Sequence, residues 1–387
     1  MITRIAATEL LKLAGQFKAV AVTGPRQSGK TTLVRSVFPD KPYVNLENPD
    51  FRRFAVEDPR GFLSNYPEGA VFDEIQRAPE IFSYLQQILD DNNKPGMFVL
   101  TGSNNFLLQD TISQSLAGRV GYLFLLPLSI AEINADEKAD NLIYKGGYPE
   151  LYSHETDISK YYLNYIRTYI ERDVRLIKNI TDLYAFEKFV RLCAGRIGQL
   201  LNLSNLATET GVDVKTISSW ISVLETSFIA FRLQPFHQNF NKRIVKMPKL
   251  YFYDTGLAAA LLGIENQSQI MLNPYRGNLF ENLIVVEMLK RRFNTGKQNN
   301  LFFWRDNTGN EIDLLIHSNN ELVPVEIKSG QTISSELFKG LEFWQKLQKS
   351  EVKGYLVYAG EMEQQRSNGI KVVPFHKLNL VDDENFI

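Results

Sequence analysis

The stretch Gly24-Pro-Arg-Gln-Ser-Gly-Lys-Thr31 follows a short apolar run, residues 19–23, that is typical of a buried strand. It matches the pattern GxxxxGK[ST] of a phosphate-binding loop between a strand and a helix. The two glycines are needed because backbone N–H groups must approach phosphate oxygens more closely than a Cβ atom permits. The helix after the loop directs its positive N-terminal end at the same anion. A chance glycine-rich turn is the alternative for this stretch alone.

The chemistry of this loop assigns roles to its side chains. Lys30 is expected to reach the β- and γ-phosphates of a nucleotide, and Thr31 to offer its hydroxyl to Mg²⁺. We therefore predict ATP and Mg²⁺ as cofactors. The predicted nucleotide-binding residues are Gly24, Pro25, Arg26, Gln27, Ser28, Gly29, Lys30, Thr31 and Thr32.

Two further apolar runs end in polar residues. Residues 70–76, Ala-Val-Phe-Asp-Glu-Ile-Gln, have the form of a Walker B strand, in which Asp73 completes the Mg²⁺ shell and Glu74 orients the attacking water. Residues 97–101 precede Gly-Ser-Asn-Asn, where a side chain could sense the γ-phosphate, and we favour Asn104 over Ser103. Strand-loop-helix units at this spacing predict an α/β fold, a parallel sheet with its ligands at the carboxyl ends of the strands.

Length and composition favour a multidomain protein with ordinary cores. The chain has 387 residues, of which 44% are hydrophobic, and this length predicts two or three domains. The longest apolar stretch, residues 120–131, contains Pro127 and is well short of the roughly 20 residues that span a bilayer, so we expect a buried strand there. Lys12 and Lys18 interrupt the N-terminal apolar residues, so we expect no signal peptide, no membrane contact and a cytoplasmic location. The single cysteine, Cys193, excludes an internal disulfide and is expected to be a core residue.

The charge is unevenly distributed along the chain. The net charge is −1, yet residues 160–250 contain fourteen lysines and arginines against seven acidic residues. Such asymmetry favours contact with a polyanion, and nucleic acid, in particular DNA, is the predicted partner; a solvated basic face is the alternative.

The same region has a helix-turn-helix pattern. Residues 203–211 and 214–225 are expected to be helices around a turn at 211–213, and residues 228–235 and 250–253 could form the strands of a wing. One face of the second helix is apolar and its other face is polar. The apolar face comprises Val214, Ile217, Ile221 and Leu224, and the polar one Lys215, Thr216, Ser218, Ser219 and Ser222. A module that only joins domains or contacts proteins is the alternative.

A cluster of charged residues follows a polar linker after Gly263. Glu281 is expected in a helix over residues 276–293. Strand alternation places Asp313 opposite the apolar face of a strand over 311–317, and it does the same for Glu326 and Lys328 in a strand over 322–328. An antiparallel hairpin through residues 318–321 would bring Asp313 and Glu326 together.

Such a pair of carboxylates calls for a cation or a shared proton. At about 4 Å they repel by roughly 4 kcal/mol at an effective dielectric constant near 20. Mg²⁺ or Mn²⁺ held by Asp313 and Glu326 could stabilise a pentavalent phosphate, while Lys328 orients or deprotonates water beside Glu281. Arg305 on a preceding strand adds an anion-binding group. A hairpin with a merely solvated charged face is the alternative.

Nearly the whole chain resembles a family of bacterial and archaeal AAA-type ATPases with a C-terminal domain of unknown function on a restriction-endonuclease-like core. The shared motifs are GPRQSGKTT (24–32), VFDEIQRAP (71–79), LTGSNN (100–105), SLAGRV (115–120), GGYPE (146–150), YIERDV (169–174), PKLYFYDTGL (248–257), and WRDNTGNEIDLL with VEIKSG. The resemblance implies an AAA-like P-loop domain over 1–135, a helical and winged-helix middle over 136–263, and a restriction-endonuclease-like α/β domain over 264–387.

By position, Arg119 of SLAGRV corresponds to the arginine finger of AAA proteins, which completes a neighbour's site and implies a homo-oligomer; pairing with a local carboxylate is the alternative. Three functions remain open. The first is an ATPase that controls a Mg²⁺-dependent nuclease acting on DNA. The second is an ATP-dependent regulatory switch whose nuclease-like domain only binds. The third is a scaffold, which the intact Lys30, Asp73 and Glu74 argue against.

Overall fold

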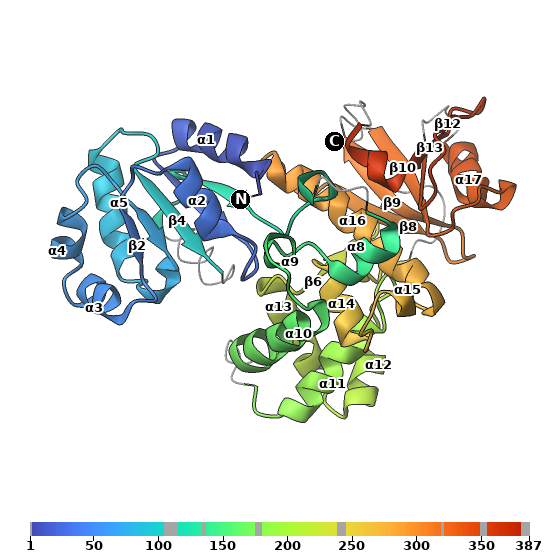
Figure 1. Cartoon of the computed structure of the whole chain (residues 1–387), viewed down its shortest axis with the longest axis horizontal. Coiled ribbons are helices and arrows are strands. Elements are labelled where there is room, and N and C mark those ends of the chain that lie inside the picture. The colour runs from blue at the N-terminus through green and yellow to red at the C-terminus, as the bar shows by residue number, and fades with distance from the viewer. Residues whose placement is uncertain are drawn as a thin grey trace.

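The computed structural model describes residues 2–103, 115–133, 137–174, 180–237, 245–318, 321–348 and 354–380, with side chains outside 171–174 and 379–380. Three parts follow one another along the chain: a lobe around a parallel sheet, a mainly helical middle, and a second sheet with its helices (Figure 1). The long helix α16 lies between the first lobe and the second sheet.

The N-terminal sheet has five parallel strands in the order β2-β3-β4-β1-β5, which confirms the predicted parallel α/β architecture. Its strands are β1 (Ala19–Thr23), β2 (Tyr43–Asn45), β3 (Val71–Asp73), β4 (Phe98–Gly102) and β5 (Val120–Phe124). Strands β1 and β4 are buried throughout, as expected of continuous apolar runs that are covered on both faces. Because neighbouring strands run in the same direction, the carboxyl ends of β1, β3 and β4 meet at one edge.

Helices cover both faces of this sheet. They are α1 (Ala6–Gln16), α2 (Lys30–Val37), α3 (Pro49–Glu57), α4 (Pro59–Ser64), η1 (Ile75–Arg77) and α5 (Ile81–Asp91). Val20 and Val22 of β1 belong to the hydrophobic cluster with α1 and α2, whereas Ala19 and Ala21 belong to the cluster with α4 and α5. This alternation is the two-residue period of a strand buried on both sides.

The middle part is mainly helical. Its elements are α7 (Ile130–Ile133), α8 (Ala139–Lys145), α9 (Glu150–Ser153), α10 (Ile158–Tyr165), the π-helix η2 (Ile166–Val174), α11 (Leu183–Ala194), α12 (Leu203–Thr210), α13 (Val214–Thr226), β6 (Ala230–Leu233), β7 (Lys249–Phe252), α14 (Thr255–Leu261) and α15 (Ser268–Leu272). The predicted pair of helices is present as α12 and α13. Strands β6 and β7 pair antiparallel.

Two of the expectations for individual segments differ from the structure. Val214, expected on the buried face, is 43% exposed because it is the first residue of α13 after the cap Asp213, and Trp220 packs on Phe186 instead. The apolar stretch 120–131 is a strand only to Phe124. It then passes through Pro127, which has no N–H to donate to a neighbouring strand, and it re-enters a helix at Ile130.

The C-terminal part contains a mixed sheet of six strands in the order β12-β13-β11-β10-β9-β8. Its elements are α16 (Arg276–Asn294), β8 (Leu301–Arg305), β9 (Glu311–Ser318), β10 (Glu321–Lys328), η3 (Ser335–Phe338), α17 (Lys339–Gln348), β11 (Tyr355–Tyr358), β12 (Gln364–Gln365), β13 (Lys371–Pro374) and η4 (Phe375–Leu380). The predicted antiparallel pairing of β9 with β10 is confirmed. Strand β11 lies parallel to β10, and α17 lies between them in the sequence.

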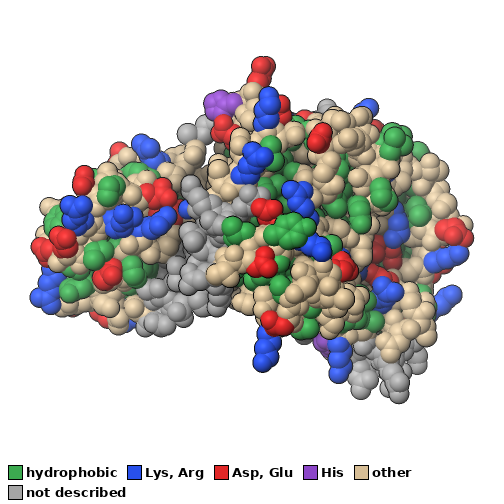
Figure 2. Space-filling model, turned by 90° about the horizontal axis from the view of Figure 1, so that it is seen from below, with side chains coloured by type: hydrophobic (Ala, Val, Ile, Leu, Met, Phe, Trp, Pro, Cys, Tyr) green, Lys and Arg blue, Asp and Glu red, His purple; other side chains and the backbone are tan. Residues whose placement is uncertain are grey.

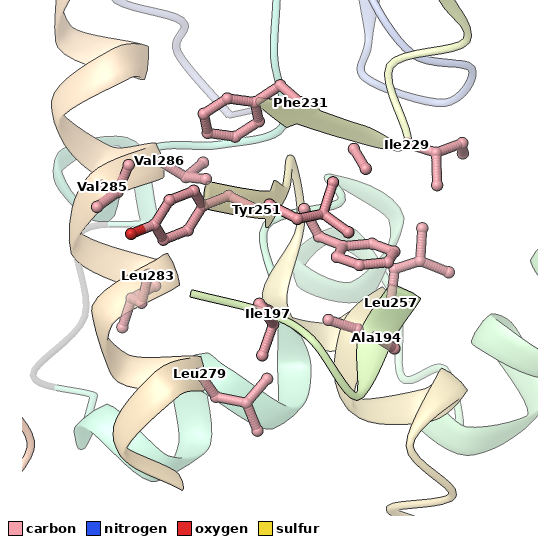
Figure 3. Packing of buried hydrophobic residues seen from close by; sticks show 14 of the residues in the cluster. Ala194, Ile197, Ile229, Phe231, Tyr251, Leu257, Leu279, Leu283, Val285 and Val286 are labelled. Atoms are coloured by element: carbon pink, nitrogen blue, oxygen red, sulfur yellow. The ribbon is translucent and has the colours of Figure 1, made fainter. Parts of the chain in front are cut away.

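One hydrophobic core joins the middle and C-terminal parts. Val286 and Leu283 of α16 lie near Tyr251 of β7, and Leu279 lies further along the helix towards Ile197 (Figure 3). Cys193 is buried in this core, as expected. Among the described residues, no helix combines the length and the apolar character that a membrane crossing requires.

Candidate nucleotide site and the carboxylate–lysine cleft

The phosphate-binding loop has the backbone that its glycines predict. Gly24 has φ 155°, and a Cβ atom there would lie 2.1 Å from the carbonyl oxygen of Leu125. Gly29 has φ 89° and is the residue before α2, so the loop turns into the helix through a left-handed residue. The N-terminal end of α2 is therefore directed at the space that the loop encloses.

Lys30 turns back onto the loop. Its Nζ donates hydrogen bonds to the carbonyl oxygens of Gly24 at 2.9 Å and Pro25 at 2.7 Å. Burial lowers the pKa of Lys30 to about 8, although the charges of Glu74 and Asp73 act in the opposite direction. The ammonium group thus occupies the centre of the loop, where a phosphate group would accept its hydrogen bonds.

Asp73 gathers three hydroxyl groups at the end of β3. Its Oδ2 accepts from Thr31 Oγ1 at 2.8 Å and from the Tyr43 hydroxyl at 2.5 Å, and its Oδ1 accepts from Thr101. Burial and the Asp73 carboxylate raise the pKa of Tyr43 above its ordinary value. Residues from the loop, β2, β3 and β4 thus meet at the edge that the parallel sheet defines.

The oxygens of Thr31 and Asp73 fit a magnesium ion. Thr31 Oγ1 lies 2.8 Å from Asp73 Oδ2, so both oxygens could be ligands of the same small cation. The donor set is all oxygen, which Mg²⁺ prefers. The two predicted metal ligands therefore lie together in a geometry that a cation can bridge.

Glu74 follows Asp73 with a left-handed backbone, φ 54°, which is unusual for a residue other than glycine. Its Oε2 accepts hydrogen bonds from Ser103 Oγ at 3.0 Å and from Gln76 Nε2 at 2.5 Å. Ser103, the less favoured candidate for the γ-phosphate sensor, therefore contacts the predicted catalytic acid Glu74. Asn104 itself lies outside the described residues.

The remaining residues of the loop face different neighbours. The guanidinium of Arg26 lies 5.3 Å from the ring centre of Tyr169, and the Tyr161 hydroxyl donates to Gln27 Oε1 at 2.7 Å. The Ser28 hydroxyl is buried and has no hydrogen-bond partner among the described residues, and Thr32 is exposed in the first turn of α2. The loop is therefore contacted by α10 and η2 of the middle part as well as by its own sheet.

Arg119, the predicted arginine finger, pairs within its own lobe. Its Nε lies 2.5 Å from Asp90 Oδ1 and its Nη2 lies 3.0 Å from Asp90 Oδ2. This bidentate pair has the geometry that arginine and carboxylate favour. The alternative of local pairing thus describes Arg119 in this structure.

The predicted carboxylate cluster assembles in a cleft of about 690 Å³ between the middle and C-terminal parts. Lys328 Nζ lies 2.9 Å from Asp313 Oδ2 and 2.7 Å from Glu326 Oε2, and the backbone N–H of Ile327 donates to Asp313 at 2.9 Å. Burial and the neighbouring Asp313 raise the pKa of Glu326 well above its ordinary range. The pKa of Asp313 is lowered, because Lys328 and Lys249 outweigh its burial. Lys328, which contacts both carboxylates, supplies the cation that the pair was expected to need.

Lys249 supplies a cation that the sequence did not reveal. Its Nζ lies 2.9 Å from Glu281 Oε1 and 2.5 Å from Glu311 Oε1, and its side chain is almost fully buried. The Tyr251 hydroxyl also donates to Glu281, at 2.6 Å. Burial raises the pKa of Glu281, and Lys249 opposes that shift. Lys249 is the first residue of β7, directly before the predicted wing strand over residues 250–253. The only available signal was Lys-x-Tyr alternation, which puts both side chains on one face of β7.

The fit of a metal ion to this cleft is weaker than at Thr31 and Asp73. Within the described ranges, no group of three or more histidine, cysteine, aspartate or glutamate side chains is placed to hold a metal ion. Lys328 contacts oxygens of Asp313 and Glu326, and Lys249 contacts an oxygen of Glu281. Arg305 also lines the cleft, where its Nη1 lies 3.2 Å from Glu311 Oε2. In this structure each carboxylate of the cluster is therefore paired with a lysine or an arginine.

A parallel sheet with a phosphate-binding loop after β1 and an aspartate at the end of β3 defines a P-loop ATPase. Comparison with known proteins agrees, since residues 16–134 match the family described as an AAA domain. Residues 136–268 and 276–378 match families described as domains of unknown function, DUF8612 and DUF4143. The chain thus contains a P-loop domain of the AAA type, which supports ATP binding, and two further domains whose families have no known function.

Uncharacterized proteins of Mycobacterium bovis and Mycobacterium tuberculosis are each 31% identical to this chain over 336 residues, which is 86% of this chain and 75% of theirs. The chain belongs to the family of these mycobacterial proteins. Among solved structures, a Walker-type ATPase of Pyrococcus abyssi is similar at 14% identity with a TM-score of 0.41, covering 66% of this chain and 94% of that one.

The lowered pKa of Lys30 predicts that nucleotide binding depends on pH. Bound phosphates require the charged ammonium, whereas the free protein loses this proton as the pH rises through about 8. The affinity for ATP should therefore fall above that pH, by up to about tenfold per pH unit. Titration calorimetry between pH 7 and 9.5, in buffers of different ionisation enthalpy, should show proton uptake on binding. An affinity that stays constant over this range would contradict the assignment.

The buried position of Lys249 predicts a large stability effect. Lys249→Met leaves Glu281 and Glu311 without their common cation and should lower the free energy of unfolding by about 3–5 kcal/mol. Urea unfolding can be followed through the fluorescence of the buried Trp304 and Trp344. The exposed Lys339, changed to Met, is the matched control and should leave the transition almost unchanged. Equal effects of the two substitutions would refute this account of the cleft.

Proposed function

We propose that this protein hydrolyses ATP at the edge of the N-terminal sheet, with Mg²⁺ held by Thr31 and Asp73. The observation that carries the proposal is the separation of 2.8 Å between these two oxygens, directly beside a buried lysine in a phosphate-binding loop. When bound, the metal ion would neutralise charge on the phosphates. The chemistry that remains is the work of Lys30, Glu74 and the loop backbone.

In this proposal Lys30 exchanges its two carbonyl partners for oxygens of the β- and γ-phosphates. The exchange is favourable because carbonyl dipoles are replaced by full negative charges, which also restore the pKa of the ammonium group. Glu74 would accept a proton from, or orient, the water that attacks the γ-phosphate. Ser103, which already donates to Glu74, would hold that carboxylate in place. Asn104 remains the proposed sensor of the γ-phosphate.

For the C-terminal part of the chain, we propose a restriction-endonuclease-like domain that engages nucleic acid, in particular DNA. The succession of α16, the antiparallel strands β8, β9 and β10, then α17 and the parallel strand β11 supports such a core. Asp313 and Glu326 remain the proposed ligands of a divalent cation, with Lys328 and Glu281 beside them. Cleavage would require a divalent cation to displace Lys328 from both carboxylates.

The alternative function is an ATP-dependent regulatory switch whose cleft only binds a partner. The observation that favours it is that each of the four cleft carboxylates is paired with Lys249, Lys328 or Arg305. In addition, basic and acidic side chains of the described residues are interspersed on the face shown in Figure 2. Under this alternative, nucleotide turnover is slow and no cleavage occurs.

Arg119 remains a proposed arginine finger, and with it a homo-oligomer. To reach a neighbouring nucleotide, its guanidinium must leave Asp90. The exposed position of Asp90 on the sheet lobe keeps the energetic cost of that exchange small. Loss of ATP hydrolysis in Arg119→Ala, restored by mixing with a protein that lacks only Glu74, would support action between subunits.

The ATPase assignment predicts separable effects on binding and on hydrolysis. Lys30→Ala should lose ATP binding, whereas Glu74→Gln should retain binding and lower hydrolysis by about 100-fold. Phosphate release and equilibrium binding of a fluorescent ATP analogue measure the two steps. The exposed Glu80, changed to Gln, is the matched control at the start of α5 and should behave as the wild type. Hydrolysis by Lys30→Ala at the wild-type rate would remove the nucleotide site from the mechanism.

Cleavage and binding by the C-terminal cleft can be distinguished with linear, branched and single-stranded DNA, Mg²⁺ or Mn²⁺, and ATP present or absent. Cleavage that disappears in Asp313→Asn, but survives in the exposed control Glu342→Gln, would establish the nuclease. Binding without cleavage, with hydrolysis of ATP intact, would establish the switch. Binding should be compared at several salt concentrations, because phosphate contacts release counterions.

A further inference from the structure

Arg4, which precedes α1, is a buried arginine that contacts the back of the phosphate-binding loop. Its side chain is almost fully inaccessible, and its Nη1 donates to the carbonyl oxygen of Ser28 at 2.6 Å. Its Nη2 donates to the carbonyl oxygen of Leu126 at 2.7 Å, and its Nε pairs with Glu132 Oε1 at 3.0 Å. One guanidinium thus joins the loop to the segment after β5.

The contact with Ser28 fixes the direction of a backbone donor. A trans peptide is planar, so the carbonyl of Ser28 and the N–H of Gly29 point in opposite directions. Because Arg4 holds the carbonyl on the outer side of the loop, the N–H of Gly29 points to the inner side, where the phosphates bind. Gly29 has the left-handed backbone that this arrangement requires. Arg4 therefore acts on the phosphate site through a peptide group, without touching the ligand.

Glu132 connects the same arginine to helix α16. Its Oε1 accepts from the N–H of Ile5 at 2.7 Å, and its Oε2 accepts from the N–H of Ser129 at 2.8 Å. The next N–H, that of Ile130, donates to both carboxylate oxygens of Glu287 on α16, at 3.0 and 3.1 Å. The segment between Leu126 and Ile133 is thus held by Arg4 on one side.

On its other side this segment contacts α16, and the N–H of Leu128 donates to the carbonyl oxygen of Gly147 at 2.7 Å. Lys290 Nζ donates to the carbonyl oxygen of Leu128 at 2.8 Å, one turn along the helix from Glu287. The side chains of Glu287 and Lys290 are buried, as are those of Arg4 and Glu132. Buried charges keep their partners, because a lost partner leaves an uncompensated charge out of water. A shift of the loop that moves Arg4 must therefore be followed by the segment and by α16.

We propose that Arg4 is a positioning residue of the nucleotide site, and that the Arg4–Glu132 pair links the conformation of the phosphate-binding loop to helix α16. The proposal rests on ATP binding at that loop and adds a residue from outside the motif. Six residues before Glu287, the same helix places Glu281 in the carboxylate–lysine cleft. The link is reciprocal, so occupation of either site biases the other.

The first test is the substitution Arg4→Lys. Lysine keeps the charge beside Glu132, but its ammonium group lacks the planar geometry by which the guanidinium donates to Ser28, Leu126 and Glu132 together. The affinity for ATP should fall by about tenfold, while the thermal midpoint without nucleotide stays close to that of the wild type. The exposed Arg53, changed to Lys, is the matched control on the same lobe. An unchanged affinity, or a loss of affinity matched by an equal loss of thermal stability, would overturn the positioning role.

The second test uses the wild-type chain, so that it stands even if Arg4→Lys does not fold. Amide hydrogen exchange is measured with and without a non-hydrolysable ATP analogue and Mg²⁺. Slower exchange at Ser129 and Ile130, together with the loop amides, supports the link. Protection of the loop with no change at Ser129 and Ile130 overturns it. No protection at the loop itself means that the proposed ATP site has failed, an outcome that is distinct from failure of the link.

Discussion

The burial of helix α16 is the constraint on which the arrangement of the three parts depends. Almost every residue from Leu279 to Lys290 is buried, so each polar side chain there must find a partner inside the protein. Those partners come from different parts of the chain. Glu281 pairs with Lys249, Asn282 bonds to both backbone groups of Phe252, and Glu287 accepts from Ile130. The polar requirements of one helix therefore attach it to β7 and to the segment that leaves the first sheet.

Lys30 and the two predicted metal ligands of the nucleotide site are hydrogen-bonded within the protein. Lys30 rests on loop carbonyls, and Thr31 rests on Asp73. Both contacts bring the side chains to the positions that phosphates and a metal ion would use. This arrangement gives the buried ammonium of Lys30 and the carboxylate of Asp73 hydrogen-bond partners, so that nucleotide binding is an exchange of partners. Burial lowers the pKa of Lys30 in this arrangement.

Sequence reasoning found the parts of the sites whose chemistry is local. The phosphate-binding loop is read from eight consecutive residues, and the facing positions of Asp313 and Glu326 follow from alternation along two strands joined by a short turn. It could not find contacts that are made only by folding. Arg4 and Glu132 are 128 residues apart, and Lys249 reaches Glu281 from another part of the chain. No local pattern encodes such pairs, because tertiary packing alone decides which buried charges meet.

The most direct measurement of the central claim is a structure of the protein with Mg²⁺ and a non-hydrolysable ATP analogue. We predict that Lys30 leaves the carbonyls of Gly24 and Pro25 for the phosphates, and that Mg²⁺ lies between Thr31 and Asp73. Arg4 should still hold the carbonyl of Ser28. Nucleotide bound elsewhere, or Lys30 still on the loop carbonyls with nucleotide present, would contradict the account.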